Sequence, residues 1–180
     1  MKKIGFLVGS LRKDSYTLKV AKKLIELLPE GFEGQLLEIG DLPFYNEDLE
    51  SNVPEAWARF RNEAKALDGF FFVTPEYNRS MPGVIKNAID VGSRPYFESI
   101  WGKKPSTIVS VSPGALGGYG ANHHVRQSMV VLDVPVMAQP EAYLGGVAQT
   151  INEEGVHDES LLGFLKVIVD SYAEFFARFA

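Results

Sequence analysis

The sequence predicts an α/β domain built on a doubly wound, five-stranded parallel sheet with strand order 2-1-3-4-5 and helices on both faces. Short, continuous apolar runs alternate with segments of helical period, as expected for strands that are buried on both faces and joined by helical crossovers. About five such strands with right-handed crossovers match the doubly wound order. The length of 180 residues, with no internal repeat or linker, fits a single domain over residues 1–180.

Five apolar runs are the predicted strands. Four of them are compact, continuous runs of the kind that lie inside a sheet, and the last is the candidate for a short fifth strand. The predicted strands cover residues 4–8, 35–39, 69–73, 106–111 and 134–138.

Amphipathic segments between these runs are the predicted helices. Pro29 and Gly31 end the first helix, and Pro54 lies in the first turn of the second, which a long loop precedes. The last helix has the clearest apolar stripe, and this stripe must pack on the sheet. The predicted helices cover residues 18–28, 54–67, 84–89, 121–132 and 161–179.

Composition excludes several function classes. The 18 Lys and Arg against 23 Asp and Glu give a net charge of -5, which argues against a broad nucleic-acid or anionic-membrane surface. With no cysteine, the chain has no disulfide framework, thiolate nucleophile or Cys-ligated metal, so redox chemistry needs a bound cofactor. The N-terminal apolar run is too short for a signal peptide, and no stretch approaches the ~18 apolar residues of a membrane span. We therefore expect a soluble, cytoplasmic protein.

The loop after the first strand, residues 9–17, predicts a phosphate site. Ligands of doubly wound sheets bind beyond the carboxyl ends of the strands, so the loops after strands one, three and four are expected to share one site. Backbone N–H groups at a helix start favour an anion, and Arg12 supplies a bidentate fork. Further hydrogen bonds come from the hydroxyls of Ser10, Ser15 and Thr17. The alternative is that the serine before the helix only caps it and the cations are solvated.

Other nucleotide-binding patterns are absent. The chain has neither a Gly-x-x-x-x-Gly-Lys nor a Gly-x-Gly-x-x-Gly segment, so ATP hydrolysis and ordinary dinucleotide binding lose support. A response-regulator receiver shares the sheet order, but it needs acidic residues where Gly9 and Ser10 end the first strand.

The loops after the third and fourth strands predict a flat ligand. Residues 112–120 contain four glycines, which let backbone approach a ring closely. Tyr77 and Tyr119 can pack on an aromatic face, and Asn78 offers both a donor and an acceptor to a heterocycle. Each loop also fits an ordinary turn, but three loops converging on one edge favour a bound ring system.

Several segments match a known family in combination. They are Gly9-Ser10-Leu11-Arg12 with Ser15 and Thr17, Thr74-Pro75-Glu76-Tyr77-Asn78, Met81-Pro82-Gly83 and Lys86-Asn87-Ala88-Ile89-Asp90. This combination resembles the NAD(P)H-dependent FMN reductase family of flavodoxin-like fold, which includes bacterial chromate, quinone and azo-dye reductases. The resemblance extends over nearly the whole chain, and the pairing of the Gly-Ser-x-Arg loop with the Pro-Glu-Tyr-Asn segment is its most specific part.

The resemblance implies FMN as the cofactor and NADPH or NADH as the reductant. No catalytic side chain is required because the flavin carries the chemistry, although Asn78 is a candidate for orienting substrates. Two positions depart from the family pattern: Thr17 stands where asparagine is common, and Arg79 where an aromatic or uncharged residue often follows. The implied FMN contacts are Ser10, Arg12, Ser15, Tyr16, Thr17, Pro75, Glu76, Tyr77, Asn78, Ser112, Gly114, Gly117 and Gly118.

Metal and hydrolytic sites find no support. His123 and His124 are adjacent on a predicted helix, about 100° apart, so they do not ligate one metal together. Ser10 and Ser112 lack both a Gly-x-Ser-x-Gly elbow and an adjacent base.

The expected reaction is hydride transfer from NAD(P)H through FMN to quinone, azo, nitroaromatic, flavin or chromate-type acceptors by a ping-pong mechanism. The alternative is a flavodoxin-like electron carrier without its own NAD(P)H activity. Arg12, Lys13 and Arg79 count against it, because a carrier more often presents an acidic surface.

Surplus apolar residues predict a homodimer or homotetramer. The family resemblance implies the same, with the helices after strands three and four at the interface and each flavin near a subunit boundary. If instead Trp101 and the run from Met129 complete the core, this argument weakens. The residues in question are Phe44, Tyr45, Tyr96, Phe97, Ile100, Trp101, Met129, Val130, Val131 and Leu132.

Overall fold

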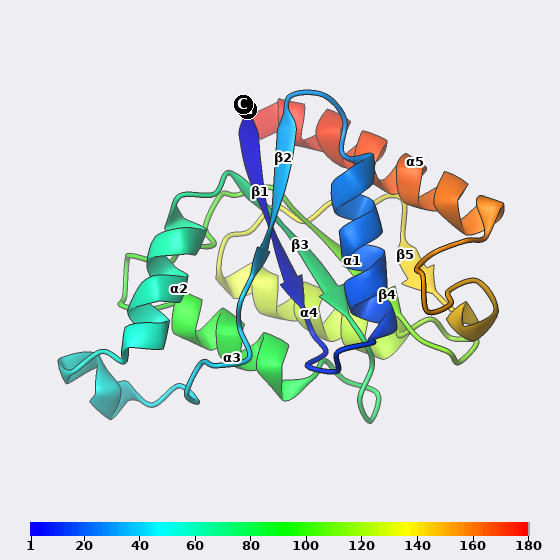
Figure 1. Cartoon of the computed structure of the whole chain (residues 1–180). Helices are drawn as coiled ribbons and strands as arrows, with labels where there is room; N and C mark the ends of the chain where they lie inside the picture. The colour runs from blue at the N-terminus through cyan, green and yellow to red at the C-terminus, as the bar shows by residue number, and fades with distance from the viewer. Residues whose placement is uncertain (180) are drawn as a thin grey trace.

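The computed structural model describes residues 1–179 and contains one five-stranded parallel sheet (Figure 1). Its order is β2-β1-β3-β4-β5, which confirms the predicted 2-1-3-4-5 arrangement. The strands are β1 (Lys2–Val8), β2 (Phe32–Leu37), β3 (Gly69–Thr74), β4 (Ser106–Val111) and β5 (Ala142–Leu144).

Helices cover both faces of the sheet (Figure 1). One face packs against α1 (Tyr16–Leu27) and α5 (Glu159–Phe176). The other packs against α2 (Glu55–Lys65), α3 (Gly83–Gly92) and α4 (Tyr119–Val131). Three short 3-10 helices complete the described elements: η1 (Glu47–Ser51), η2 (Val147–Gln149) and η3 (Ala177–Phe179). No helix in the described part of the chain is long and apolar enough to cross a membrane.

The central strands are apolar on both faces because each face is covered by helices. Phe6 and Phe71 stack with ring centroids 4.6 Å apart on the α1 and α5 side. Phe70 and Phe72 point the opposite way and pack on Trp101, with centroids 4.9 and 5.6 Å from its ring. The continuous apolar runs of the sequence are therefore strands with two buried faces.

The predicted fifth strand, residues 134–138, is wrong. This segment meets β4 only at an isolated bridge between Ser106 and Val136, and the regular ladder is made later, by Ala142–Leu144 against Val109–Val111. Pro135 has no N–H to donate to a ladder, and β5 itself is too short for its pattern to be recognised.

The second strand and the last helix also differ from their predicted bounds. The second strand begins at Phe32, earlier than residues 35–39 indicate, because it is an edge strand whose side chains are mostly solvated and therefore show no apolar run. The last helix ends at Phe176, and the exposed Phe179 lies in the 3-10 turn that follows.

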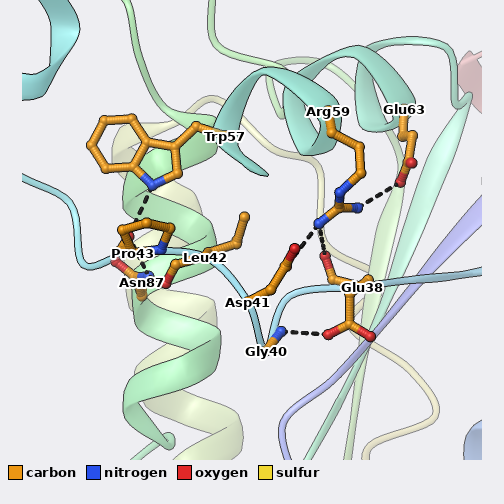
Figure 2. Close-up of polar contacts among 9 residues, drawn as sticks. All are labelled: Glu38, Gly40, Asp41, Leu42, Pro43, Trp57, Arg59, Glu63 and Asn87. Atoms are coloured by element: carbon orange, nitrogen blue, oxygen red, sulfur yellow. Dashed lines mark hydrogen bonds and ion pairs between the residues drawn. The ribbon is translucent and has the colours of Figure 1, made fainter. Parts of the chain in front are cut away.

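The long loop between β2 and α2 is anchored to two helices (Figure 2). Asn87 of α3 is buried, and its Oδ1 accepts from the N–H of Tyr45 at 2.8 Å while its Nδ2 donates to the carbonyls of Leu42 and Pro43, each at 3.1 Å. Trp57 of α2 also donates from its indole N–H to the Pro43 carbonyl at 2.9 Å. Helix α3 therefore fixes the conformation of a loop that has little regular structure of its own.

The start of the same loop is held by an arginine (Figure 2). Arg59 of α2 donates to the Glu38 carbonyl at 3.1 Å and forms an ion pair with Asp41 at 2.8 Å. Gly40 packs closely on Leu11, since a Cβ built at Gly40 would lie 2.8 Å from a Leu11 methyl group. This contact joins the anchored loop to the loop that follows β1.

Candidate functional site

The loops after β1, β3 and β4 meet at the carboxyl edge of the sheet, as predicted, and enclose a cavity of about 250 Å³. Figure 1 shows the start of α1 and the loop after β3 together at this edge. The lining residues are Ser10, Arg12, Ser15, Tyr16, Thr17, Pro75, Glu76, Tyr77, Val111, Ser112 and Pro113.

The N-terminus of α1 presents unused hydrogen-bond donors to this cavity. Ser15 is the N-cap, and its Oγ accepts from the N–H of Leu18 and from the buried Thr17 hydroxyl, each at 3.1 Å. The hydroxyl proton of Ser15 therefore remains free to donate. Within residues 1–179, the N–H groups of Tyr16 and Thr17 have no hydrogen-bond acceptor, as is usual in the first turn of a helix. Ser15 thus caps the helix and still offers a donor.

Arg12 adds positive charge to these donors. Arg12 and Lys13 are both exposed, and neither forms a salt bridge with any residue of the described chain. Only Arg12 lines the cavity, and its N–H donates to Ser10 Oγ at 3.4 Å. An unpaired guanidinium beside free N–H and O–H groups at a helix N-terminus is suited to bind a phosphate.

The loop after β3 is a tight hairpin. The N–H of Tyr77 donates to the Ser80 carbonyl at 3.0 Å and the Ser80 N–H donates back at 3.0 Å. The two residues between them, Asn78 and Arg79, have φ values of 51° and 63°. This is the left-handed backbone that a two-residue hairpin turn requires. The hairpin leaves Tyr77 half-exposed, on the wall of the cavity.

Glu76 fixes this hairpin to the start of α4. Its Oε2 accepts from the N–H of Ala121 at 3.1 Å, and its Oε1 accepts from Arg79 Nη1 at 3.3 Å. The N-cap of α4 is Gly118, which has no side chain to cap the helix. The Glu76 carboxylate therefore supplies the missing cap and lies at the positive end of the helix dipole.

The glycines after β4 serve chain packing. A Cβ at Gly117 would lie 2.5 Å from the Tyr143 carbonyl, and a Cβ at Gly120 would lie 2.6 Å from the Arg79 carbonyl. Gly117 and Gly118 are buried and lie outside the cavity lining, so the structure does not bring these two predicted FMN contacts to the cavity. Gly114 is exposed next to Ser112, whose Oγ accepts its N–H at 3.0 Å.

Tyr119 packs on protein side chains. Its ring lies 4.2 Å from the His123 ring and 5.2 Å from the Tyr143 ring, between centroids. Tyr143 donates to Glu141 at 3.0 Å, so His123 Nε2, 2.9 Å away, is the donor to the Tyr143 oxygen. Burial and the bond to Glu141 raise the pKa of Tyr143 to about 12. Tyr119 lines neither the cavity nor the groove beside it.

An open groove of about 400 Å³ adjoins the cavity and shares Arg12 and Tyr77 with it. The cavity is smaller than the roughly 300 to 1,000 Å³ of typical ligand pockets. It therefore suits the phosphate end of a larger ligand that continues along the loops. The remaining groove residues are Gly9, Leu11, Pro82, Gly83 and Val84.

The structure brings some of the predicted site residues together and leaves others apart. The structure brings nine of the thirteen predicted residues to the cavity, while Asn78 is exposed on the hairpin tip and Gly114 on the next loop. Sequence reasoning missed Val111 and Pro113 in the cavity lining, although both adjoin the predicted Ser112. Within the described residues no group of three or more His, Cys, Asp or Glu side chains is arranged to hold a metal ion.

A larger hollow of about 880 Å³ lies elsewhere, beside the ends of α3 and α4. It lacks the free helix N-terminus and the converging loops of the edge cavity. Its walls include Arg94, Tyr96, Phe97, Val131 and Leu132.

Known proteins resemble this chain along most of its length. The family model described as NADPH-dependent FMN reductase matches residues 2–149. The chain is 56% identical over 171 residues to a quinone reductase of Pseudomonas putida strain KT2440, covering 94% of this chain and 92% of that protein. It is 42% identical over 172 residues to a 2-hydroxy-1,4-benzoquinone reductase of a Burkholderia species, covering 95% and 94%.

A solved structure has nearly the same backbone. FerB of Paracoccus denitrificans, described as a flavoenzyme NAD(P)H:acceptor oxidoreductase, superposes with a TM-score of 0.92. It shares 38% sequence identity, and the match covers 99% of this chain and 98% of FerB.

Proposed function

This chain belongs to the NADPH-dependent FMN reductase family, and from that premise we propose that it passes hydride from NAD(P)H through FMN to quinones. The observation that carries the proposal is the set of unused donors at the start of α1: the free N–H groups of Tyr16 and Thr17, the Ser15 hydroxyl and the unpaired Arg12. A phosphomonoester at the end of a flavin side chain satisfies all of them at once.

The residues present fit FMN. Ser10, Arg12, Ser15, Tyr16 and Thr17 would hold its phosphate. Thr17, which stands where the family pattern has asparagine, would contribute its backbone N–H, because its hydroxyl donates to Ser15 Oγ. The ring would lie against the loops after β3 and β4. The proposed contacts there are Pro75, Glu76, Tyr77, Asn78, Ser112 and Gly114, with Gly117 and Gly118 acting indirectly by shaping the loop.

When bound, FMN supplies the redox chemistry, because it takes up hydride from a nicotinamide and releases electrons to an acceptor. The protein's task is to fix the cofactor at one edge and to leave room for substrates. The groove beside Tyr77 is open, so donor and acceptor are expected to use the same space in turn. We propose that Asn78, exposed at the hairpin tip, orients whichever substrate is present.

Quinones are the favoured acceptors because the relatives from Pseudomonas putida and Burkholderia are named for them. Azo, nitroaromatic, flavin and chromate-type acceptors remain part of the proposal as further substrates of the same open site. The electron-carrier alternative is set aside, because the family is defined by NADPH-dependent reduction. NAD(P)H is a reductant of the cell interior, so its proposed use also supports the proposed cytoplasmic location.

Steady-state kinetics test the proposed reaction. Initial rates with NADH or NADPH and a benzoquinone should give parallel double-reciprocal lines, because the first product leaves before the acceptor binds. In stopped-flow mixing at saturating FMN, Asn78→Ala should slow reduction of the FMN-loaded protein, and an unchanged rate together with an unchanged FMN affinity would refute a role for Asn78. Intersecting lines would show that both substrates bind together and would contradict the shared space.

We further propose a homodimer or homotetramer formed through the face beside α3 and α4. Ile100, Trp101 and Met129 belong to the core, so the sequence argument was wrong for them. Phe97 and its neighbour Tyr96 are nevertheless exposed, as are Val130 and Val131 on α4. Phe97 has a left-handed backbone with φ of 69°, which is unusual for a bulky residue.

This exposed face supports a two-fold contact. Tyr96, Phe97 and Val131 line the 880 Å³ hollow, and the charged side chains around it provide a polar rim. A second copy of the chain presents the same surface and covers both apolar patches. The face lies on α3 and α4, whose first turns adjoin the proposed flavin site, so each flavin is expected near a subunit boundary.

Light scattering during size-exclusion chromatography tests the assembly. We expect a mass of twice or four times the 19.9 kDa of the chain. The double variant Phe97→Asp, Val131→Asp should shift the mass toward one chain, whereas Val167→Asp, at a half-exposed position on α5, should not. A wild-type mass near a single chain, with FMN bound and activity retained, would refute the proposal.

A further inference from the structure

Arg79 adopts a backbone conformation that its side chain type does not favour. It is the second residue of the two-residue hairpin turn, with φ of 63°, and glycine is the residue that such positions prefer. Asn78, with φ of 51°, is a residue type that tolerates this region well. Residues kept in unfavourable backbone regions cluster at functional sites. The unfavourable backbone conformation therefore indicates that the Arg79 side chain has a function that glycine could not supply.

A carboxylate holds the Arg79 guanidinium while leaving most of it available. Glu76 Oε1 accepts from Nη1 at 3.3 Å, and the Arg79 side chain remains 72% exposed whereas that of Glu76 is 11% exposed. A guanidinium has five N–H donors in a rigid fork, and this contact uses one of them. Because Glu76 is itself bonded to the Ala121 N–H at 3.1 Å, the tether is firmly positioned.

Arg79 lies on the hairpin whose Tyr77 borders the proposed substrate space. Tyr77, two residues earlier, lines both the cavity and the groove. The Arg79 carbonyl is packed against α4 so closely that a Cβ at Gly120 would lie 2.6 Å from it. The backbone of the hairpin tip is therefore fixed, and its cation faces solvent on the same hairpin as Tyr77.

Because the chain as a whole is negatively charged, an exposed cation at Arg79 favours the binding of anionic substrates. A net charge of -5 repels anionic substrates at long range. Arg12 is already assigned to the flavin phosphate, so it is neutralised when the cofactor is bound. Arg79 then supplies an exposed positive charge on the hairpin that carries Tyr77.

We propose that Arg79 is a specificity-determining residue that binds an oxyanion carried by the substrate. The oxyanion is either the 2′-phosphate that distinguishes NADPH from NADH or an acidic substituent on the quinone, and both suit the guanidinium fork. The proposal rests on the proposed function, since it concerns the same donors and acceptors.

Equilibrium titration of the oxidised, FMN-loaded protein tests the proposal without turnover. One pair of ligands is NADP⁺ and NAD⁺, and the other is 1,4-naphthoquinone-2-sulfonate and 1,4-naphthoquinone. Arg79→Gln should weaken binding of at least one charged ligand about fivefold, as for loss of an exposed ionic contact, while its neutral or unphosphorylated counterpart changes little. High salt should diminish the difference.

The pair that responds identifies the source of the oxyanion. Lys166→Gln is the matched control, because Lys166 is an exposed cation on α5 paired with a single carboxylate, Asp170. It should leave all four affinities unchanged. Equal affinities of wild type and Arg79→Gln for both charged ligands would overturn the proposal. Failure of the proposed function would instead show as absent quinone reduction by the wild type, whatever the titrations give.

A glycine variant separates selection from folding. Arg79→Gly removes the same charge and relieves the left-handed backbone, so its melting temperature should rise by about 2–4 °C for a chain of this size. It should lose the preference for the charged ligand to the same extent as Arg79→Gln. A glycine variant that retains this preference would show that the side chain is not the determinant.

Discussion

Replacing Arg12 by alanine is expected to weaken FMN binding by at least about tenfold, equivalent to about 1.4 kcal/mol. The guanidinium lines the cavity, has no salt-bridge partner within residues 1–179 and lies beside the free donors at the start of α1. A charge-assisted contact to a phosphate is lost in the variant, while the fold loses no internal ion pair. Fluorescence titration of the apoprotein with FMN measures the change.

Two controls isolate the phosphate contact. Riboflavin lacks the phosphate, so its affinity should be weak in the wild type and unchanged by Arg12→Ala. Lys13→Ala removes the same charge from an exposed neighbour that does not line the cavity, and it should weaken FMN binding much less. An unchanged FMN affinity in Arg12→Ala would remove the anchoring role.

Replacing Asn87 by alanine is expected to reduce the free energy of unfolding by about 3 kcal/mol. Asn87 is 7% exposed, and its side chain makes three hydrogen bonds to the backbone of the loop before α2 (Figure 2). In the variant the Pro43 carbonyl keeps its bond from Trp57, but the Tyr45 N–H and the Leu42 carbonyl lose their side-chain partner. Leaving two such groups unpaired is what makes the change costly.

Urea unfolding of the variant and of two comparison proteins measures this loss. Asn46→Ala removes one cap from an exposed part of the same loop and should cost about 1 kcal/mol or less. Asn87→Asp keeps an acceptor for the Tyr45 N–H but loses both donors, so it should also be destabilising. If Asn87→Ala costs no more than Asn46→Ala, the loop does not depend on α3 for its conformation.

Local pattern was sufficient for most of the fold. Strands buried on both faces must be apolar throughout, so the segments around Phe6, Phe71 and Val109 were recognisable without tertiary information. The order of strands and helices then restricted the topology to one that brings three loops to a single edge. The loop after β1 was likewise recognisable as a candidate anion site, because it places hydroxyls and a cation at the start of a helix.

Contacts between distant segments decided the rest. The short β5 and the edge strand β2 are defined by hydrogen bonds to the neighbouring strand, and their sequences show almost no apolar run. Gly117 and Gly120 were interpreted as ligand contacts, or as part of a loop that makes them, but they are required by the approach of Tyr143 and Arg79. The sequence shows a glycine at such a position, but it does not show whether a ligand or another segment of the chain packs against it.

The sequence by itself determined which loops meet at the carboxyl edge and that hydroxyls and a cation lie at the start of α1, because both follow from local composition and strand order. Only the tertiary structure decided what each polar side chain is bonded to. It made Glu76 the cap of α4 and the tether of Arg79, and it made Asn87 the anchor of a loop more than forty residues away along the chain. The physical reason is that a buried polar group must find a hydrogen-bond partner, and that partner is fixed by packing between segments far apart in the sequence.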